Sequence, residues 1–297
     1  MVLVIAVSLA GALFIAVGFV VQQHAASEEP ANERLSPRLL LHLVRRPIWL
    51  GGIAAMAAGQ VLGAVALAKG DIALVEPLMA TNLLFALPLA ARWRHQRLRM
   101  REWLGAGALV VGLAAFIAAG HPAGGSTRHL PWPNWVISGG LIVLVAVALV
   151  SLSRRRPAAR QASLLAAAAG CLYGLQDALT ERSAAELHNG LSSMLISWPV
   201  FALLLVAVSG LFLAQSAFEA APLAASLPLV TGLEPITGIC FGVGVYGEHL
   251  NLAPALLAVE VAGVVAMAWG VYLVAASPII TGAALLPSTA RAGREAA

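Results

Sequence analysis

The chain has 297 residues, of which 60% are hydrophobic and only 11% are charged, and its mean hydropathy is +0.87. A soluble domain of this length would need far more polar surface, so the composition excludes that class and indicates a polytopic membrane protein. The net charge of +4 comes from arginines in short segments between apolar runs, which excludes a nucleic-acid-binding role.

Apolar runs long enough to cross a hydrocarbon core of about 30 Å recur along the chain and leave no room for a separate soluble domain. The first run has no basic residue before Arg34, so it lacks the positive start of a secretory signal and is expected to be a retained span. Hydropathy predicts nine spans, at 2–22, 48–68, 71–91, 102–119, 133–152, 161–181, 191–218, 222–247 and 252–276. The predicted fold class is therefore an all-α polytopic membrane protein with about nine transmembrane helices.

The basic residues fall almost entirely on one side of these spans. That side holds 15 of the 18 Lys and Arg residues, namely Arg34, Arg38, Arg45, Arg46, Arg92, Arg94, Arg97, Arg99, Arg101, Arg154, Arg155, Arg156, Arg160, Arg291 and Arg294. The other side holds Lys69, Arg128 and Arg182. The positive-inside rule then places the N-terminus outside and the tail at 277–297, expected to be disordered, in the cytoplasm. The expected location is a bacterial plasma (inner) membrane.

The two halves of the chain repeat. The stretch GALFIAVGFVVQQHAA (11–26) matches GCLYGLQDALTERSAA (170–185) at an offset of 159, and LVEPLM (74–79) matches GLEPIT (232–237) at an offset of 158. Two glycine pairs share the second offset, Gly105 with Gly263 and Gly112 with Gly270. The predicted organisation is a four-span repeat at 1–122, a connector span and basic loop at 123–160, and a second repeat at 161–276 that the odd connector inverts. Inverted repeats around a midplane site are the architecture of secondary transporters.

Two stretches carry a family resemblance. PITGICFGVGVYGEHL, from Pro235 to Leu250, resembles the drug/metabolite transporter (DMT) superfamily, EamA type, with its Pro, its Gly-Glu pair (Gly247-Glu248) and a glycine-spaced last helix. The stretch RRPIWLGGIAAMAAGQVLGAVALAKGDIALVEPL (45–78) is similar to the NIPA-type branch, through its basic-Pro-x-Trp entry, its Met before Gly59-Gln60 and its LVxPL. The resemblance implies a nine-span transporter with an external N-terminus, and the NIPA-type branch is linked to magnesium transport.

Two Glu-Pro pairs, Glu76-Pro77 and Glu234-Pro235, combine an in-span charge with a helix-breaking residue. A central charge costs about 2.5–3.5 kcal/mol on insertion scales, so each carboxylate is a candidate for the transport pathway. Proline leaves a backbone carbonyl without its helical donor, which predicts a break in the helix and an oxygen-rich cation or proton site. The alternative is that Glu76-Pro77 simply opens a helix. Glu234 is the stronger candidate, because Pro228 and Pro235 bracket a longer segment.

Two further acids lie within predicted spans. Gln176 and Asp177 occupy successive faces of the sixth span, so at least one of them must point into the bundle. Asp177 is interpreted either as a proton relay or as a residue that reaches the outer interface near Arg182. Glu260 lies in the middle of the last span, where it either lines the cavity or forms a hydrogen bond to a neighbouring helix.

Uncharged polar residues at depth either touch substrate or bridge helices. The candidates are Gln60, Asn82, Gln215 and Ser216, and Tyr173 and Trp198 either wall a pocket or pack. A metal site, if the chain has one, would use Glu76, Asp177 and Glu234. The two cysteines lie in separate apolar segments, so neither a disulfide between them nor a zinc site is expected.

Three functions compete at this point. The first is a secondary transporter of a small metabolite or drug, and the second is a NIPA-like carrier of Mg²⁺ or another divalent cation. The third is a non-transporting membrane scaffold or lipid-binding subunit. An enzyme is not expected, since no Ser/His or His/acid constellation lies at depth, and no phosphate loop for ATP is present. The sequence implies no cofactor, H⁺ or Mg²⁺ as coupling ion, membrane lipids as partners and, as an open alternative, a homodimer.

Overall fold

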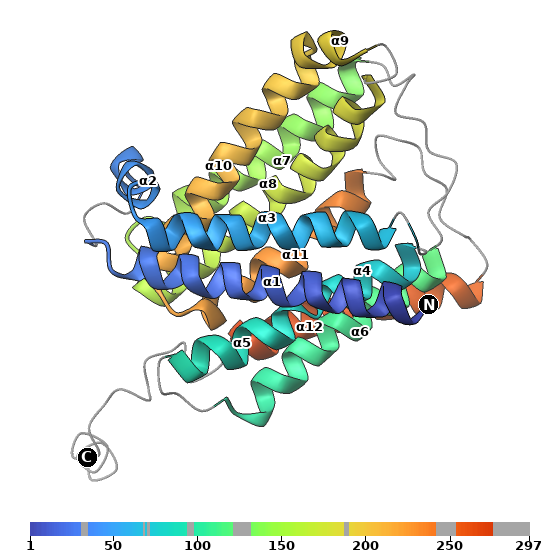
Figure 1. The fold of residues 1–297 in the computed structure, drawn as a ribbon, viewed down its shortest axis with the longest axis horizontal. Coiled ribbons are helices and arrows are strands. Elements are labelled where there is room, and N and C mark those ends of the chain that lie inside the picture. Colours follow the sequence, from blue (N-terminus) through green and yellow to red (C-terminus); the bar gives the residue numbers. More distant parts are fainter. Residues whose placement is uncertain are drawn as a thin grey trace.

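The computed structural model describes residues 1–30, 35–67, 69, 72–93, 98–120, 132–186, 190–241 and 254–275, and these residues form helices and short turns (Figure 1). In chain order the helices are α1 Val2–Ser27, α2 Pro37–Val44, α3 Pro47–Leu67, α4 Ile72–Ala80, α5 Asn82–Trp93, α6 Met100–Gly120, α7 Trp132–Ser153, α8 Ala158–Glu186, α9 Leu191–Ile196, α10 Trp198–Ala220, α11 Leu223–Phe241 and α12 Pro254–Ala275. The predicted Gly247-Glu248 pair and the tail at 277–297 lie outside the described residues.

Six helices in the described part of the chain are long and apolar enough to cross a membrane: α1, α3, α6, α7, α8 and α10. Two shorter apolar helical stretches, Leu78–Trp93 and Pro254–Gly270, accompany them. The expectation of an all-α membrane protein is therefore confirmed. The count of nine spans stays a prediction.

The expected helix breaks at the Glu-Pro pairs are wrong in position. Helix α4 continues past Pro77 to Ala80, and the interruption falls at Thr81, whose hydroxyl donates to the carbonyl of Leu78. Helix α11 runs without a break through both Pro228 and Pro235. A proline removes one helical hydrogen bond, and membrane helices tolerate this where neighbouring helices pack around the site.

The predicted span at 191–218 is also two helices. Helix α9 ends at Ile196 and α10 begins at Trp198, with Ser197 between them in an extended conformation. Pro199 lies in the first turn of α10, a position where its missing N–H costs no helical hydrogen bond. Proline thus starts a helix here.

Glycines bring helices of the two halves into close contact. A Cβ atom on Gly112 of α6 would lie 2.6 Å from the carbonyl oxygen of Gly263 on α12, and one on Gly270 would lie 2.5 Å from that of Gly105. Residues with side chains would force these backbones apart, so small residues are required. The repeated glycines therefore allow α6 and α12 to approach closely.

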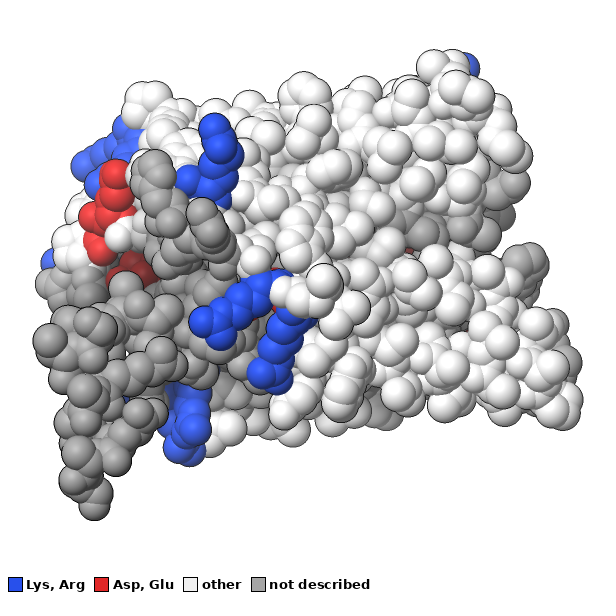
Figure 2. Space-filling model, turned by 90° about the horizontal axis from the view of Figure 1, so that it is seen from below, with Lys and Arg blue, Asp and Glu red and all other residues white. Residues whose placement is uncertain are grey.

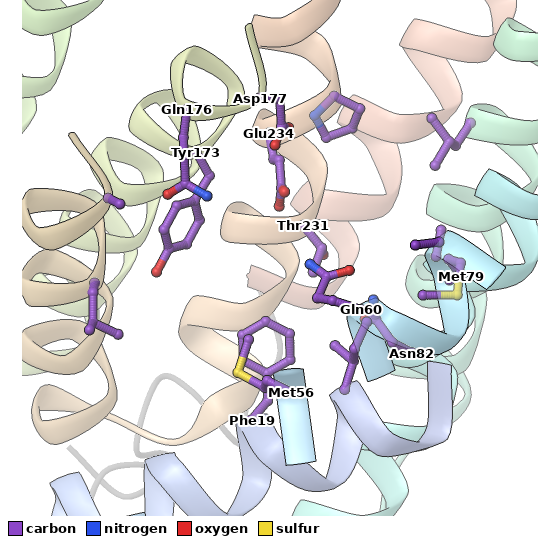
Figure 3. A pocket seen from close by; sticks show the side chains of 18 residues that line it. Phe19, Met56, Gln60, Met79, Asn82, Tyr173, Gln176, Asp177, Thr231 and Glu234 are labelled. Atoms are coloured by element: carbon purple, nitrogen blue, oxygen red, sulfur yellow. The ribbon is translucent and has the colours of Figure 1, made fainter. Parts of the chain in front are cut away.

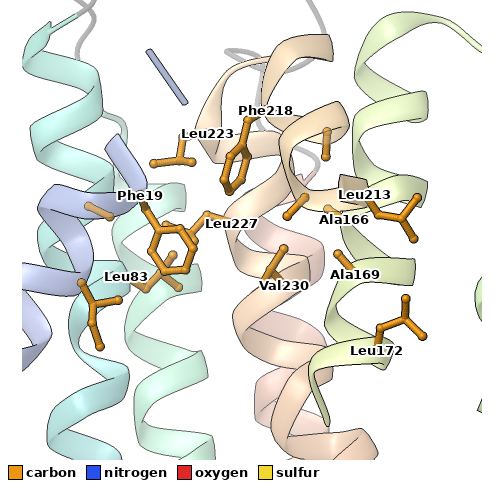
Figure 4. Packing of buried hydrophobic residues seen from close by; sticks show 14 of the residues in the cluster. Phe19, Leu83, Ala166, Ala169, Leu172, Leu213, Phe218, Leu223, Leu227 and Val230 are labelled. Carbon is orange, nitrogen blue, oxygen red and sulfur yellow. The ribbon is translucent and has the colours of Figure 1, made fainter. Parts of the chain in front are cut away.

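The buried core lies where α1, α8, α10 and α11 meet (Figure 4). Phe218 of α10, Leu223 and Leu227 of α11 are fully or almost fully buried there. The ring of Phe19 on α1 meets Phe218 edge-on, with the ring centroids 6.1 Å apart. This aromatic pair joins the first helix of one half to the other half of the chain.

Basic residues gather at one end of the bundle, at the left of Figure 2, while the rest of the visible surface is almost uncharged. Helix α1 ends here, since Arg46 before α3 forms ion pairs with both Glu28 and Glu29. Helix α5 also ends here, because Trp93 lies against His24 with ring centroids 4.9 Å apart. We call this the arginine-rich end; Arg46 before α3 and Arg92 in the last turn of α5 belong to it.

Candidate functional site

A cavity of about 570 Å³ lies between helices of both halves of the chain (Figure 3). Side chains from α1, α3, α4, α5 and α6 line one part of it, and side chains from α8, α10 and α11 line the rest. Pockets for small organic ligands have volumes of about 300–1,000 Å³. The space between the two halves is thus of the right size for a small organic molecule.

The lining includes many of the residues that the sequence singled out. Six of the ten predicted pathway residues border the cavity, namely Gln60, Asn82, Gln176, Asp177, Glu234 and Pro235. They come from four helices, α3, α5, α8 and α11, which are far apart in the sequence. The cavity therefore brings two carboxylates and three amides together.

Two carboxylates lie close to each other in the cavity wall, where α8 packs against α11 (Figure 3). A Cβ atom on Gly174 would lie 2.5 Å from the carbonyl oxygen of Glu234, so the two backbones touch at this level. Asp177 is almost one turn further along α8 and has an exposed side chain, whereas the side chain of Glu234 is half-buried. Among the described lining residues there is no Lys or Arg, and Asp177 and Glu234 are the acids of the wall.

Other polar groups add acceptors and donors. The amide oxygen Oδ1 of Asn82 is buried and has no hydrogen-bond partner among the described residues. Thr231 on α11, whose hydroxyl donates to the carbonyl of Leu227, and Tyr173 on α8 line the same space. A bound molecule with N–H groups would therefore meet oxygen acceptors from several sides.

The opposite wall is apolar and adaptable. Phe19 and Met56 lie together at the end of the cavity away from the acids, and Met79 borders its side (Figure 3). Thioether side chains are flexible and polarisable, so they fit ligands of irregular shape. The cavity is thus acidic at one end and apolar at the other.

Two predicted pathway residues lie elsewhere. Gln215 is fully buried between helices, where it accepts from the indole N–H of Trp49 and donates to Gln22. Glu260 on α12 is 2% exposed and does not line this cavity, and its Oε1 has no hydrogen-bond partner among the described residues. The side chains of Glu76 and Pro77 lie outside the described residues.

Of the three predicted metal ligands, the structure describes the side chains of Asp177 and Glu234 but not that of Glu76. Within the described part of the chain, no group of three or more His, Cys, Asp or Glu side chains is placed to hold an ion. Both cysteines are free, as the sequence predicts, with Cys171 buried and Cys240 exposed.

Sequence reasoning missed several residues at this site. Phe19, Met56, Met79 and Thr231 line the cavity, but nothing distinguishes them from packing residues in the sequence. The motif of Gly170 and Gly174, a small-xxx-small pattern, is the signal that would have located the contact of α8 with α11. The adjacent pair Gln22-Gln23 in the first span is a further polar signal that the sequence carries.

Comparison with known proteins places the chain among relatives. No protein-family model matches the sequence, and no solved structure matches it. An uncharacterized protein of Corynebacterium glutamicum is 32% identical over 251 residues, which cover 82% of this chain and 85% of the relative. Similarity at this level over most of both chains reflects a shared fold, and the chain therefore belongs to the same family as this corynebacterial protein.

Proposed function

We propose that this chain is a secondary transporter of the DMT superfamily that moves a small organic cation across the plasma membrane by alternating access. The observation that carries the proposal is the cavity between the two halves, with Asp177 and Glu234 at one end of its wall and apolar side chains at the other. Positively charged solutes such as amines would be attracted by the two carboxylates. The apolar wall formed by Phe19, Met56 and Met79 would receive the rest of such a solute.

The architecture that we propose has nine spans with the arginine-rich end in the cytoplasm. The close pairing of Gly105 with Gly270 and of Gly112 with Gly263 supports two related halves, since the first glycine of each repeat faces the second glycine of the other. A site between two inverted halves is what alternating access requires.

Mg²⁺ is the second candidate substrate, and the composition of the cavity favours it less. Hard divalent cations are bound through several oxygen ligands, with carboxylates dominant. The described lining contains two carboxylates, with amide and hydroxyl groups around them. Large apolar side chains in the wall can contact the apolar part of an organic solute, whereas a hydrated ion has no apolar part to contact them.

The experiment that separates these functions uses purified protein in proteoliposomes. Uptake of tetraethylammonium, phenethylamine and Mg²⁺ is measured in parallel, with and without a pH gradient to test H⁺ as the coupling ion. We expect gradient-dependent uptake of an organic cation and no uptake of Mg²⁺. Uptake of Mg²⁺ alone would establish the NIPA-like alternative, and uptake of none of the three would favour the scaffold.

Two neutral variants test the role of the acids. Glu234→Gln and Asp177→Asn are expected to lower organic-cation uptake at least tenfold while the protein remains folded. Glu181→Gln is the matched control, because Glu181 lies on the same helix as Asp177, one turn on, and does not line the cavity. Full uptake by Glu234→Gln would contradict the proposed site.

A further inference from the structure

A chain of buried hydrogen bonds joins the two halves next to the cavity. The indole N–H of Trp49 on α3 donates to Oε1 of Gln215 on α10 over 3.1 Å. Nε2 of Gln215 donates to Oε1 of Gln22 on α1 over 2.6 Å, and Nε2 of Gln22 donates to the sulfur of Met56 on α3. We call these four residues the glutamine chain.

Three members of the glutamine chain are buried. Trp49, Gln22 and Gln215 are each at most 4% exposed. Polar side chains inside a membrane protein must find partners within the protein, because lipid offers none. Here the partners of Gln215 both come from the first half of the sequence. The contact of Gln215 with Trp49 and Gln22 is therefore a polar link between the halves.

The position of the glutamine chain relates it to the cavity. Gln22 lies three residues after Phe19 on α1, and Gln215 lies four residues after Leu211 on α10. Phe19 and Leu211 line the cavity, and both helices run from there toward the arginine-rich end. Met56 is a member of the glutamine chain and also lines the cavity. The glutamine chain thus lies one turn below the cavity floor, on the side of the arginine-rich end.

A second contact reinforces it at the same level. Phe19 packs edge-on against Phe218, and Nε2 of Gln23 donates to the carbonyl oxygen of Phe218 over 3.4 Å. Phe19, which lines the cavity, is therefore tied to α10 by its aromatic contact with Phe218 as well as by the neighbouring amides. These contacts join α1 to α10, and the glutamine chain also includes Trp49 and Met56 of α3.

We infer that the glutamine chain is the latch that closes the cavity toward the arginine-rich end. This inference deepens the proposed function, since a latch on one side matters only if the cavity opens to both. For the cavity to open at this end, α1 must move away from α10, and the bond between Gln22 and Gln215 must break. Uncharged amides suit this task, because hydrogen bonds between membrane helices are weak enough to be broken in each cycle.

A labelling experiment tests the latch without reference to any substrate. In a background with Cys171→Ala and Cys240→Ala, Leu211→Cys serves as a reporter inside the cavity, one turn above Gln215. Inside-out membrane vesicles are treated with a membrane-impermeant maleimide, which approaches from the proposed cytoplasmic face. Labelling is expected to be slow in this background. Adding Gln215→Leu removes two hydrogen bonds across the halves and should raise the labelling rate roughly five- to tenfold.

The matched control is Ser216→Ala. Ser216 is buried and adjacent to Gln215, but its hydroxyl donates to the carbonyl of Phe212 in its own helix. Ser216→Ala should therefore leave the labelling rate unchanged. An equal rate for Gln215→Leu and Ser216→Ala would overturn the inference.

A cross-link tests the same point in a protein whose glutamine chain is intact. Gln23→Cys and Phe218→Cys in the cysteine-free background are joined by a short, reducible bifunctional thiol reagent. We expect the cross-link to abolish solute uptake and reduction to restore it; uptake unaffected by the cross-link would contradict the latch. Accelerated labelling of Gln215→Leu without uptake of any solute would uphold the latch as a moving element while contradicting the proposed transport.

Discussion

The contact of α8 with α11 gives a sharp prediction about how packing positions Glu234. A Cβ atom added at Gly174 would lie 2.5 Å from the carbonyl oxygen of Glu234 and 2.6 Å from Cβ of Thr237. Ordinary van der Waals contact begins at 3.4 Å, so the backbone of α11 would have to withdraw by about 0.9 Å in Gly174→Ala. Backbone atoms cannot rotate away as a flexible side chain can, so the whole helix segment must move.

Overpacking of this kind costs about 1–3 kcal/mol. Alanine also stabilises a helix by about 1 kcal/mol relative to glycine, which acts in the opposite direction. Gly238→Ala is the control that isolates the packing effect, because Gly238 lies on α11 four residues after Glu234 and an added Cβ atom would meet no atom of the described residues within 4 Å. The helix effect is common to both variants and cancels in their difference. We expect Gly174→Ala to be less stable than Gly238→Ala by about 1–3 kcal/mol.

The assay is unfolding in detergent micelles by sodium dodecyl sulfate, followed by far-ultraviolet circular dichroism, together with binding of phenethylamine. Because Glu234 lies on the displaced segment, Gly174→Ala should weaken binding by tenfold or more, whereas Gly238→Ala should leave it unchanged. Equal stability and equal binding for the two variants would refute the packing argument.

Three further outcomes follow from the contacts described above. Gly112→Ala should destabilise the α6–α12 contact by about 1–3 kcal/mol relative to Gly107→Ala, where an added Cβ atom meets none of the described atoms within 4 Å; chemical unfolding of both variants checks this. Glu260→Gln should leave phenethylamine affinity within twofold, since Glu260 does not line the cavity; a tenfold loss measured by titration calorimetry would place it in the pathway. Trp49→Phe should lower stability by about 1 kcal/mol through the lost bond to Gln215, and thermal unfolding that matches the parent would contradict it.

Hydropathy and charge alone identified much of the architecture. Long apolar runs predict helices because a chain in lipid must satisfy its backbone groups internally, and the six long helices lie within or around predicted spans. The repeat in the sequence also identified the glycines of α6 and α12, which allow the two backbones to touch because they have no side chain. The gathering of arginines at one end agrees with the alternation of charge along the sequence.

The positions of the prolines did not predict where the helices are interrupted. Pro228 and Pro235 lie inside a continuous helix. Helix α4, by contrast, ends at Ala80, and the interruption falls at Thr81, four residues after Pro77. A proline weakens a helix by one hydrogen bond, and whether the helix then bends, ends or continues depends on the neighbours that pack against it. Those neighbours come from distant parts of the sequence, as Gly170 and Gly174 do for α11.

The sequence by itself determined that the chain forms apolar helices suited to a membrane, and it limited the candidates for a polar interior to a few residues, because polar groups are costly in lipid and rare in apolar runs. It did not determine which of them share a cavity. Asp177 and Glu234 meet there, whereas Gln215 binds Gln22 and Glu260 lies elsewhere. Helices that are apolar all round carry no amphipathic stripe to fix their rotation. Only the packing of glycines, aromatic rings and amides between helices decided which face of each helix turns toward the cavity.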